Sequence, residues 1–468
     1  MPIRKLPDAP PSVHILGPTV FLVALGVGMG ESYMWPRLVL LFGPEIRWLF
    51  LIGVTLQAVV MLEMARYAMA TGESIFSGAA RVFKPLMWFF FIAAIAVYIW
   101  PGHLSAGAAA FEEITGIPWV VTAIFGLVLV GVVFSLAKVI YNVLENVLSL
   151  LIGALVLGTA IVAAMVGSWG DVVSTISGMF SFGYLPPEAM SAAWFPVIVG
   201  ACAFAGPSGM QQMWYTLHLR DSGAGMGVHI PKVRGLRHAG EEEEMPARGF
   251  MFDTENPAEM AKWKGWRRWV TFDALLLFWG ITMLVTISFT VIAQAAVRQN
   301  PGVREVIQGD DREVALTAMA DAVSSAGSSV LGAVFLGFIA LIGLNATLGL
   351  FDSFSRGQAD MTYNFVPGAK KLGMSRLYGI FLWGVIIFGI LILLFGPADG
   401  PSGILDTLAF LSTFAMGAYC VTLLLVNNRM LPKPIRPKWW TNVIIGFGAV
   451  FYLGMLFYSL FAYGVVVG

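Results

Sequence analysis

Glu31 is the residue in this sequence whose type and position most clearly predict a chemical role. It lies in the middle of the first apolar segment, at the end of the run Gly28-Met-Gly-Glu31. A carboxylate at membrane depth is costly and is a candidate functional group by default. Its oxygens can hold a hard cation or a proton. We therefore expect Glu31 to be the main charged group of a binding site.

Glycine clusters interrupt two apolar segments that lie far apart in the sequence. One is Gly26-Val-Gly-Met-Gly-Glu31, and the other is Gly206-Pro-Ser-Gly209. Unwound backbone is tolerated at membrane depth only where it lines a buried polar site. Two broken helices in the two halves of a chain indicate the substrate site of a transporter. We expect this site to be formed by Glu31, Gly28, Gly30, Ser32, Ala203, Phe204, Gly206, Ser208, Gly209 and Asn345.

The types of these groups leave more than one ligand open. Glu31 and the Ala203 carbonyl are the expected metal ligands, and oxygen donors suit a partly hydrated Mg²⁺ or Mn²⁺. Sulfur from Met29, Cys202 or Met210 would favour a softer ion. Half-helix N-termini would instead attract the carboxylate of an amino acid or another small organic solute. A further alternative is an ion pair between Glu31 and Arg37, or another internal cation, without contact to a substrate.

His103 follows Pro101-Gly102 in the third apolar segment. An imidazole titrates near neutral pH and can carry a proton, so we expect His103 and Glu31 to be the proton-coupling residues. The alternative is a buried polar residue that bonds a neighbouring helix. Two charge pairs at helical spacing, Glu63 with Arg66 and Asp352 with Arg356, are expected to be structural.

Composition predicts an all-α polytopic membrane protein. Of the 468 residues, 58% are hydrophobic and only 12% are charged, which excludes an ordinary soluble domain. The net charge of zero gives no case for a nucleic-acid partner, and no nucleotide-binding or catalytic motif predicts an enzyme or a cofactor. A window of about 19 residues predicts eleven spans, near 15–42, 46–70, 86–110, 118–137, 142–166, 192–217, 269–297, 328–354, 376–396, 404–426 and 441–466.

Basic residues in the loops predict the orientation. The expected loop 219–268 is rich in Lys and Arg, whereas the loop 167–191 has none. By the positive-inside rule we expect a cytoplasmic N-terminus, an external C-terminus and a location in the cell inner membrane. The expected partners are the lipid bilayer and the transported ion or small solute, with the chain acting as a monomer.

Several short motifs, in order along the chain, resemble the Nramp (natural resistance-associated macrophage protein) family of divalent metal transporters. They are the segments Gly17-Pro-Thr-Val-Phe-Leu-Val-Ala-Leu-Gly26, Ala70-Thr-Gly-Glu-Ser74, Ile92-Ala-Ala-Ile-Ala96, Gly200-Ala201 and Arg356-Gly-Gln-Ala-Asp-Met361. The resemblance implies a LeuT-type fold with broken first and sixth helices. It implies inverted repeats at 15–166 and 192–426, and an additional helix at 441–466, in a single transmembrane domain.

The metal-binding motifs of that family are replaced here. Gly28-Met-Gly-Glu31 stands where the family has Asp-Pro-Gly-Asn, and Ala201 to Gly206 lacks the family's Met and His. The resemblance therefore implies a divergent, Nramp-like secondary transporter that works by alternating access. A hard divalent cation is the expected substrate because the sulfur ligand is absent, and a small organic solute is the alternative.

Overall fold

The computed structural model describes residues 1–10, 28–136, 140–232, 245–246, 248–308, 312–396 and 400–464. In these ranges the chain is helical, and an isolated β-bridge joins Ile3 and Met251. Eight helices are long and apolar enough to cross a membrane. A bent pair, Gly153–Val166 with Trp169–Gly178, makes a ninth if it is one span. The all-α, polytopic fold expected from composition is confirmed.

In the described residues, the first half of the chain contains three helices of 18 residues or more, α3, α7 and α8, and several shorter ones. The expected first span enters the described residues at Gly28, so its first half lies outside them. The expected third span breaks between Tyr98 and Gly102, as Pro101 predicts. The elements are η1 (Gly30–Met34), α2 (Trp35–Phe42), η2 (Pro44–Arg47), α3 (Trp48–Thr71), α4 (Ile75–Val82), α5 (Lys84–Tyr98), α6 (Gly102–Thr115), α7 (Trp119–Leu136), α8 (Ile140–Val166) and α9 (Trp169–Gly178).

The second half repeats the pattern of a broken helix followed by long ones. Its broken helix consists of α10 and α11, and each part alone is too short to span a bilayer. The elements are η3 (Pro187–Met190), α10 (Phe195–Ala203), α11 (Gln211–Asp221), η4 (Gly225–His229), α12 (Pro257–Phe272), η6 (Asp273–Gly280), α13 (Ile281–Gln299), α14 (Val303–Gln308), α15 (Val314–Ala326), α16 (Ser329–Phe365), η7 (Ala369–Leu372), α17 (Met374–Phe395), α18 (Gly400–Met430), η8 (Lys433–Ile435) and α19 (Trp439–Tyr463).

The expected loop 219–268 is partly wrong, because helix replaces loop at both of its ends. α11 continues to Asp221, and α12 begins at Pro257. The Asn256 side chain accepts a hydrogen bond from the Ala258 amide at 2.9 Å and caps α12, and Pro257 suits the first helical position. Lys and Arg residues lower the mean hydropathy of α12. The hydropathy window therefore predicts a seventh span that starts at residue 269, although the helix starts at Pro257. The helix runs without interruption from 257 to 299.

Helices in the centre of the bundle approach one another through glycines. A Cβ at Gly102 of α6 would lie 2.7 Å from the Leu405 Cα of α18. A Cβ at Gly107, one turn further along α6, would lie 3.0 Å from the Gly343 Cα of α16. Small residues at such crossings allow backbones to pack closely in membrane proteins. This packing fixes α6, α16 and α18 as a unit around the centre.

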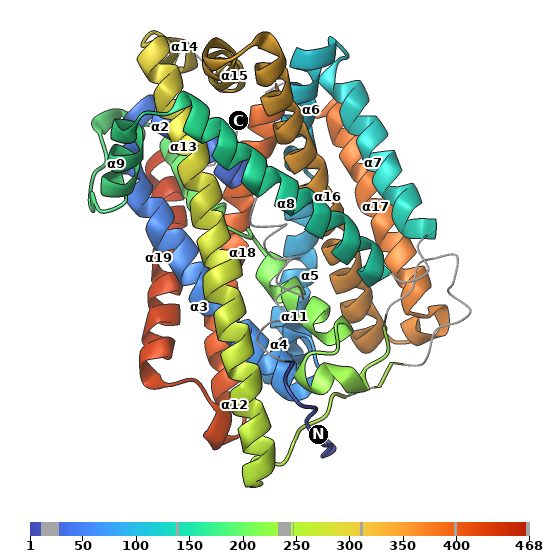
Figure 1. Cartoon of the computed structure of the whole chain (residues 1–468). Coiled ribbons are helices and arrows are strands. Elements are labelled where there is room, and N and C mark those ends of the chain that lie inside the picture. The colour runs from blue at the N-terminus through green and yellow to red at the C-terminus, as the bar shows by residue number, and fades with distance from the viewer. Residues whose placement is uncertain are drawn as a thin grey trace.

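The two ends of the bundle differ in their elements. Residues near the N-terminus contact the start of α12, where the Leu6 amide donates to Glu259 Oε2 at 2.6 Å. Figure 1 shows this end at the bottom, with α9, α14 and α15 at the top. We call the two ends the N-terminal end and the α15 end.

The division into inverted repeats at 15–166 and 192–426, and the membrane orientation, stay predictions.

Candidate functional site

The sixth span is broken over residues 204–210, between α10 and α11. Gly206 and Gly209 adopt φ values of 121° and 55°, which residues with a Cβ rarely adopt. The Tyr98 hydroxyl bridges the unwound segment: it donates to the Ser208 carbonyl at 3.1 Å and accepts from the Met210 amide at 2.8 Å. Tyr98 thus satisfies two of the backbone groups that the break releases.

Two buried glutamines attach the break to the rest of the bundle. Gln57 Nε2 of α3 donates to the Ala203 carbonyl at 3.0 Å, and Gln212 Nε2 of α11 donates to the Gln57 carbonyl at 3.0 Å. The Tyr419 hydroxyl of α18 donates to Gln212 Oε1 at 3.2 Å. The Ala203 carbonyl is therefore not free, contrary to the expectation from sequence. A carbonyl oxygen has a second lone pair, so its role as a metal ligand stays a prediction.

The start of η1 lies directly against this break. A Cβ at Gly30 would lie only 2.0 Å from the Phe204 carbonyl oxygen, so only glycine allows this approach. η1 is a π-helix, a form that is frequent at functional sites. The two interrupted segments identified in the sequence are thus in contact, as the prediction of a shared site requires.

Glu31 points into this contact. Its side chain is 1% exposed. Oε2 accepts a hydrogen bond from the Gly28 amide at 3.2 Å, and the Gly206 amide also faces the carboxylate. Among the described residues, Oε1 has no hydrogen-bond partner. Arg37 pairs instead with Asp406 at 2.6 Å, so the expected alternative of a Glu31–Arg37 ion pair is wrong.

The small polar residues of the site are partly engaged in local bonds. The Ser32 hydroxyl donates to the Gly28 carbonyl at 2.8 Å and lies 3.7 Å from the Met29 sulfur. The Ser208 hydroxyl accepts from Gln211 Nε2 at 3.2 Å. Of the three possible sulfur donors, Met29 is the one on the same turn as Glu31. The site as built therefore offers one carboxylate, hydroxyls, backbone groups and one thioether.

His103 lies beside the break but is not hydrogen bonded to it. Its ring stacks on Phe204, with the ring centroids 5.1 Å apart and an interplanar angle of 3°. Among the described residues, neither ring nitrogen has a hydrogen-bond partner. The alternative of a polar residue bonded to a neighbouring helix is therefore not what the structure shows. Its role in proton coupling stays a prediction.

Asn345 lies on α16, near the same region. A Cβ at Gly343, two residues earlier, would lie 2.5 Å from the His103 carbonyl and 2.9 Å from the Met29 Cε. The Asn345 side chain is fully buried. This part of α16 therefore borders the site, but contact of Asn345 with a substrate stays a prediction.

The donor set limits the kind of ion that fits. Over the part of the chain that the structure describes, no three His, Cys, Asp or Glu side chains come together in a group that could hold a metal ion. A cation at Glu31 would rely on one carboxylate, on backbone oxygens and on its own waters. Mg²⁺ usually keeps several waters and binds one or two carboxylates, so the set suits a partly hydrated hard cation.

Ionic contacts that the sequence did not reveal close the α15 end. Asp406 of α18 accepts from Arg37 Nη2 at 2.6 Å and from Arg312 Nη1 at 2.9 Å. The Tyr33 hydroxyl lies 2.5 Å from the Ser402 hydroxyl and donates to the Arg312 carbonyl at 2.8 Å. We call these five residues the α15-end closure. The only sequence signal for these contacts is that charged residues occur at membrane depth, where they usually pair with one another.

A second set of buried charges closes the N-terminal end. Arg356 of α16 binds Asp352 at 2.9 Å and also binds Asp221 of α11. Arg220 Nη1 donates to Asp360 Oδ1 at 2.7 Å. The predicted Asp352–Arg356 pair is confirmed, and so is the Glu63–Arg66 pair, at 2.5 Å. We call the five residues Arg220, Asp221, Asp352, Arg356 and Asp360 the N-terminal closure.

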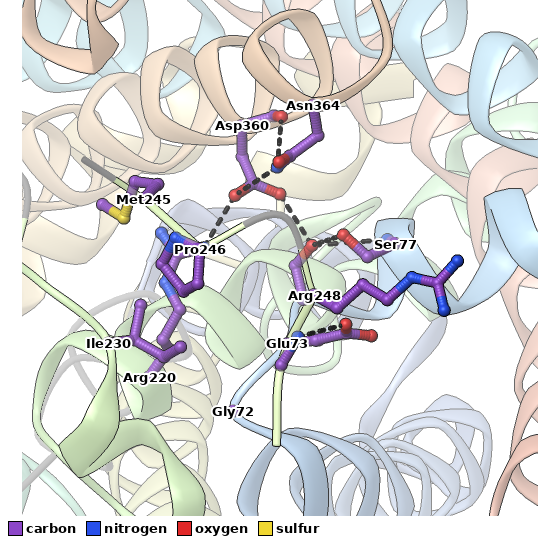
Figure 2. A pocket seen from close by; sticks show the side chains of 12 residues that line it. Gly72, Glu73, Ser77, Arg220, Ile230, Met245, Pro246, Arg248, Asp360 and Asn364 are labelled. Atoms are coloured by element: carbon purple, nitrogen blue, oxygen red, sulfur yellow. Dashed lines mark hydrogen bonds and ion pairs between the residues drawn. The ribbon is translucent and has the colours of Figure 1, made fainter. Parts of the chain in front are cut away.

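A short strap, residues 248–251, covers the N-terminal closure. The Gly249 amide donates to Glu73 Oε1 at 2.6 Å, and the Phe250 amide donates to the Thr71 carbonyl at 2.9 Å. A polar cavity of about 30 Å³ lies between the strap and Asp360. Figure 2 shows the side chains that line it. Glu73 also binds Arg81: partial burial lowers the pKa of Arg81, but the hydrogen bond and charge of Glu73 outweigh it, so the pKa is raised.

No protein-family model matches this sequence, and no curated protein matches it. Solved structures match nearly the whole chain. The manganese transporter of Eremococcus coleocola, in complex with an aromatic bis-isothiourea substituted compound, has a TM-score of 0.63 at 13% identity over 97% of this chain and 87% of that one. A mutant of that transporter reaches 0.65 at 13% identity, over 98% and 90%.

A second kind of transporter has the same architecture. Mhp1, a nucleobase-cation-symport-1 family transporter in a closed conformation with bromovinylhydantoin bound, has a TM-score of 0.54 at 12% identity. The match covers 96% of this chain and 93% of that one. These likenesses show that the chain has the LeuT-type fold, which confirms the fold expected from the sequence.

Proposed function

We propose that this protein is a secondary transporter that moves a small solute across the membrane by alternating access. The observation that carries the proposal is Glu31 Oε1: a buried carboxylate oxygen without a partner among the described residues, at the contact between η1 and the break of the sixth span. An unsatisfied buried charged group is costly, so a group with this placement is a candidate ligand-binding group.

The substrate that we propose is a divalent cation such as Mn²⁺ or Mg²⁺, bound by Glu31 while it keeps part of its water shell. The oxygen-rich donor set with a single carboxylate supports a hard, hydrated ion. The fold shared with a manganese transporter supports an Nramp-like mechanism. The closures at the two ends would open alternately, each giving access to the site from one side of the cell inner membrane.

A small organic solute is the second candidate, and one observation favours it. The rings of His103 and Phe204 stack at the break, and aromatic rings of this kind can pack against a ring or an apolar chain of a solute. Mhp1, with the same fold, has an organic ligand bound. The N-terminus of α11, which begins at the break, would attract the carboxylate of such a solute.

A thermal-shift screen of the purified protein separates the two candidates. A ligand that binds only the folded state at 100 times its Kd stabilises it by about 2.7 kcal/mol. We expect Mn²⁺ or Mg²⁺ to raise the melting temperature of the wild type and not that of Glu31→Gln. Glu113→Gln, on an exposed residue at the end of α6, is the matched control. A shift with amino acids or carboxylates and none with metals would replace the cation by the organic solute.

His103 provides the test of proton coupling. We propose that His103 and Glu31 exchange the coupled proton, because both lie at the break: His103 stacks on Phe204, and the Gly206 amide faces Glu31. His103→Ala should flatten the dependence of uptake on external pH in proteoliposomes, while Phe204 and the rest of the site keep their fold. An unchanged pH profile would remove His103 from the coupling path.

A further inference from the structure

Three threonines on α13 have unusual hydroxyl groups. Thr282, Thr286 and Thr290 are fully buried and recur every four residues, so they lie along one face of the helix. Within the described part of the chain, none of their hydroxyls has a hydrogen-bond partner. A buried hydroxyl without a hydrogen bond destabilises the folded state, and here the arrangement is repeated three times. We call these residues the threonine file.

Other hydroxyls in α13, α16 and α18 bond their own helix backbone. Ser288, also on α13, donates to the Leu284 carbonyl at 2.9 Å. Thr347 of α16 donates to Gly343 at 2.7 Å, and Thr422 of α18 donates to Ala418 at 2.9 Å. Bonding to the carbonyl four residues earlier is the usual solution for such residues in membrane helices. The hydroxyls of the threonine file do not make this bond, although Ser288 on the same helix does.

The neighbours of this face show where it points. Phe278, one turn before Thr282, lies against the sixth-span break: a Cβ at Gly206 would be 3.0 Å from its ring. Phe289, next to Thr290, packs against Phe335 of α16, with the ring centroids 5.8 Å apart. The face between these two aromatic rings is therefore directed toward the centre of the bundle. η1 and α2 pack against α13, and Figure 1 shows α2 beside α13.

We propose that the threonine file is the polar wall of the path by which a hydrated divalent cation moves between the α15 end and Glu31. This inference rests on the proposed function. α13 runs from the level of the break toward α14 and α15, so the three hydroxyls lie at successive heights along that route. Hydroxyls that are not committed to the backbone can bond the waters of the ion. A cation that dehydrates reluctantly needs such partners.

The path is closed in this structure because α2 packs against α13. All three threonines are fully buried, and Glu31 is 1% exposed. Movement of η1 and α2 away from α13 would expose the file and Glu31 together. The file therefore belongs to the transport route and not to the ligands of the bound ion, which makes the two roles separable by experiment.

The test compares uptake with binding in matched variants. In proteoliposomes with Mn²⁺ as the probe, the triple variant Thr282→Val, Thr286→Val and Thr290→Val should lower the initial uptake rate at least about tenfold. The triple Thr→Ser variant should restore most of the rate, and Ser288→Ala should leave it unchanged. The Kd of Mn²⁺ measured by calorimetry should stay within about twofold, because Glu31 is intact. Melting temperature and size-exclusion profile show whether each variant folds.

Cysteine labelling tests the route without reference to the substrate. In a background with Cys202 and Cys420 replaced by alanine, Thr286→Cys should react with a membrane-impermeant thiol reagent added from the α15 end, and Ser288→Cys should not. Two results would overturn the proposal: an uptake rate in the triple valine variant equal to that of the wild type, or faster labelling of Ser288→Cys than of Thr286→Cys. If the wild type binds no Mn²⁺ but Thr286→Cys is labelled, the proposed cation fails while the route stands.

Discussion

The closures at the two ends of the molecule are built differently. At the α15 end, Asp406 is shared by Arg37 and Arg312, and one hydroxyl pair, Tyr33 with Ser402, adds to it. The Glu313 carboxylate also accepts from the Ser402 amide at 3.0 Å. At the N-terminal end, three carboxylates and two arginines form a continuous buried chain, and the strap lies over it.

The difference indicates how the site is opened. Opening the α15 end separates one buried carboxylate from its arginines. Opening the N-terminal end must break several ion pairs and release the strap. Breaking a buried pair is expensive, because it leaves charges uncompensated in a low-dielectric interior. We therefore expect the α15 end to open more readily, and the N-terminal closure to dominate the stability of the protein.

The largest expected effect is that of Arg356→Met. The substitution leaves Asp352 without its arginine and removes one partner of Asp221, both fully buried. Loss of one partner of a buried pair costs about 3–5 kcal/mol. The melting temperature should fall accordingly in thermal denaturation. Arg376→Met, on an exposed residue of α17, should have no such effect. A similar, small fall in melting temperature in both variants would mean that the ion pairs of the N-terminal closure contribute little to the stability of the protein.

Asp406→Asn should have a smaller effect on stability and a local effect on opening. Asparagine keeps a hydrogen-bonding group but removes the charge that Arg37 and Arg312 share. The loss of bonds between charged groups is expected to cost about 1.5–3 kcal/mol. Hydrogen exchange should rise for the amides around Ser402 and stay unchanged in the segment 352–360 of α16. Equally faster hydrogen exchange at both ends would contradict the prediction that the two closures open independently.

Gly249→Ala tests the strap. A Cβ at this position would lie 2.1 Å from the Thr71 carbonyl and 2.5 Å from the Glu73 Cγ, so the strap must shift. Crowding of this kind costs about 1–3 kcal/mol. We expect faster proteolysis near Phe250 and a higher uptake rate, because the N-terminal end opens more easily. Gly446→Ala, with open space around its position, is the control. A strap that resists proteolysis as before would exclude its part in closing this end.

The smallest expected effect is that of removing one hydroxyl at each end. Ser402→Ala loses the hydroxyl bond to Tyr33, and Tyr378→Phe loses the 3.0 Å bond to Asp352. A single hydrogen bond contributes about 1 kcal/mol, and one to a charged group somewhat more. Tyr378→Phe should therefore lower the melting temperature more than Ser402→Ala. The reverse order, in the same denaturation assay, would indicate that the α15 end is the stronger closure.

Sequence reasoning predicted those parts of the site that depend on local patterns. The break at Gly206-Pro-Ser-Gly209 was predictable, because glycines with positive φ and a proline cannot continue a helix. The burial of Glu31 followed from its position in an apolar segment. The start of α12 was missed, because its Lys and Arg residues hide an apolar face that includes Trp263 and Trp266.

Long-range partners could not be predicted in the same way. Arg37 and Asp406 are 369 residues apart, and no local pattern joins them. The bridging role of Tyr98 and the bond of Gln57 to Ala203 depend on how α3, α5 and the break are packed together. Such contacts follow from tertiary packing, which a single sequence without its fold does not specify.

The most direct measurement is a calorimetric titration of Mn²⁺ and Mg²⁺ into the purified wild-type protein and into Glu31→Gln. We expect saturable binding of one ion by the wild type and no detectable binding by Glu31→Gln, with equal melting temperatures for the two proteins without metal. Undiminished binding by Glu31→Gln would contradict the placement of the cation at the buried carboxylate between the two interrupted helices.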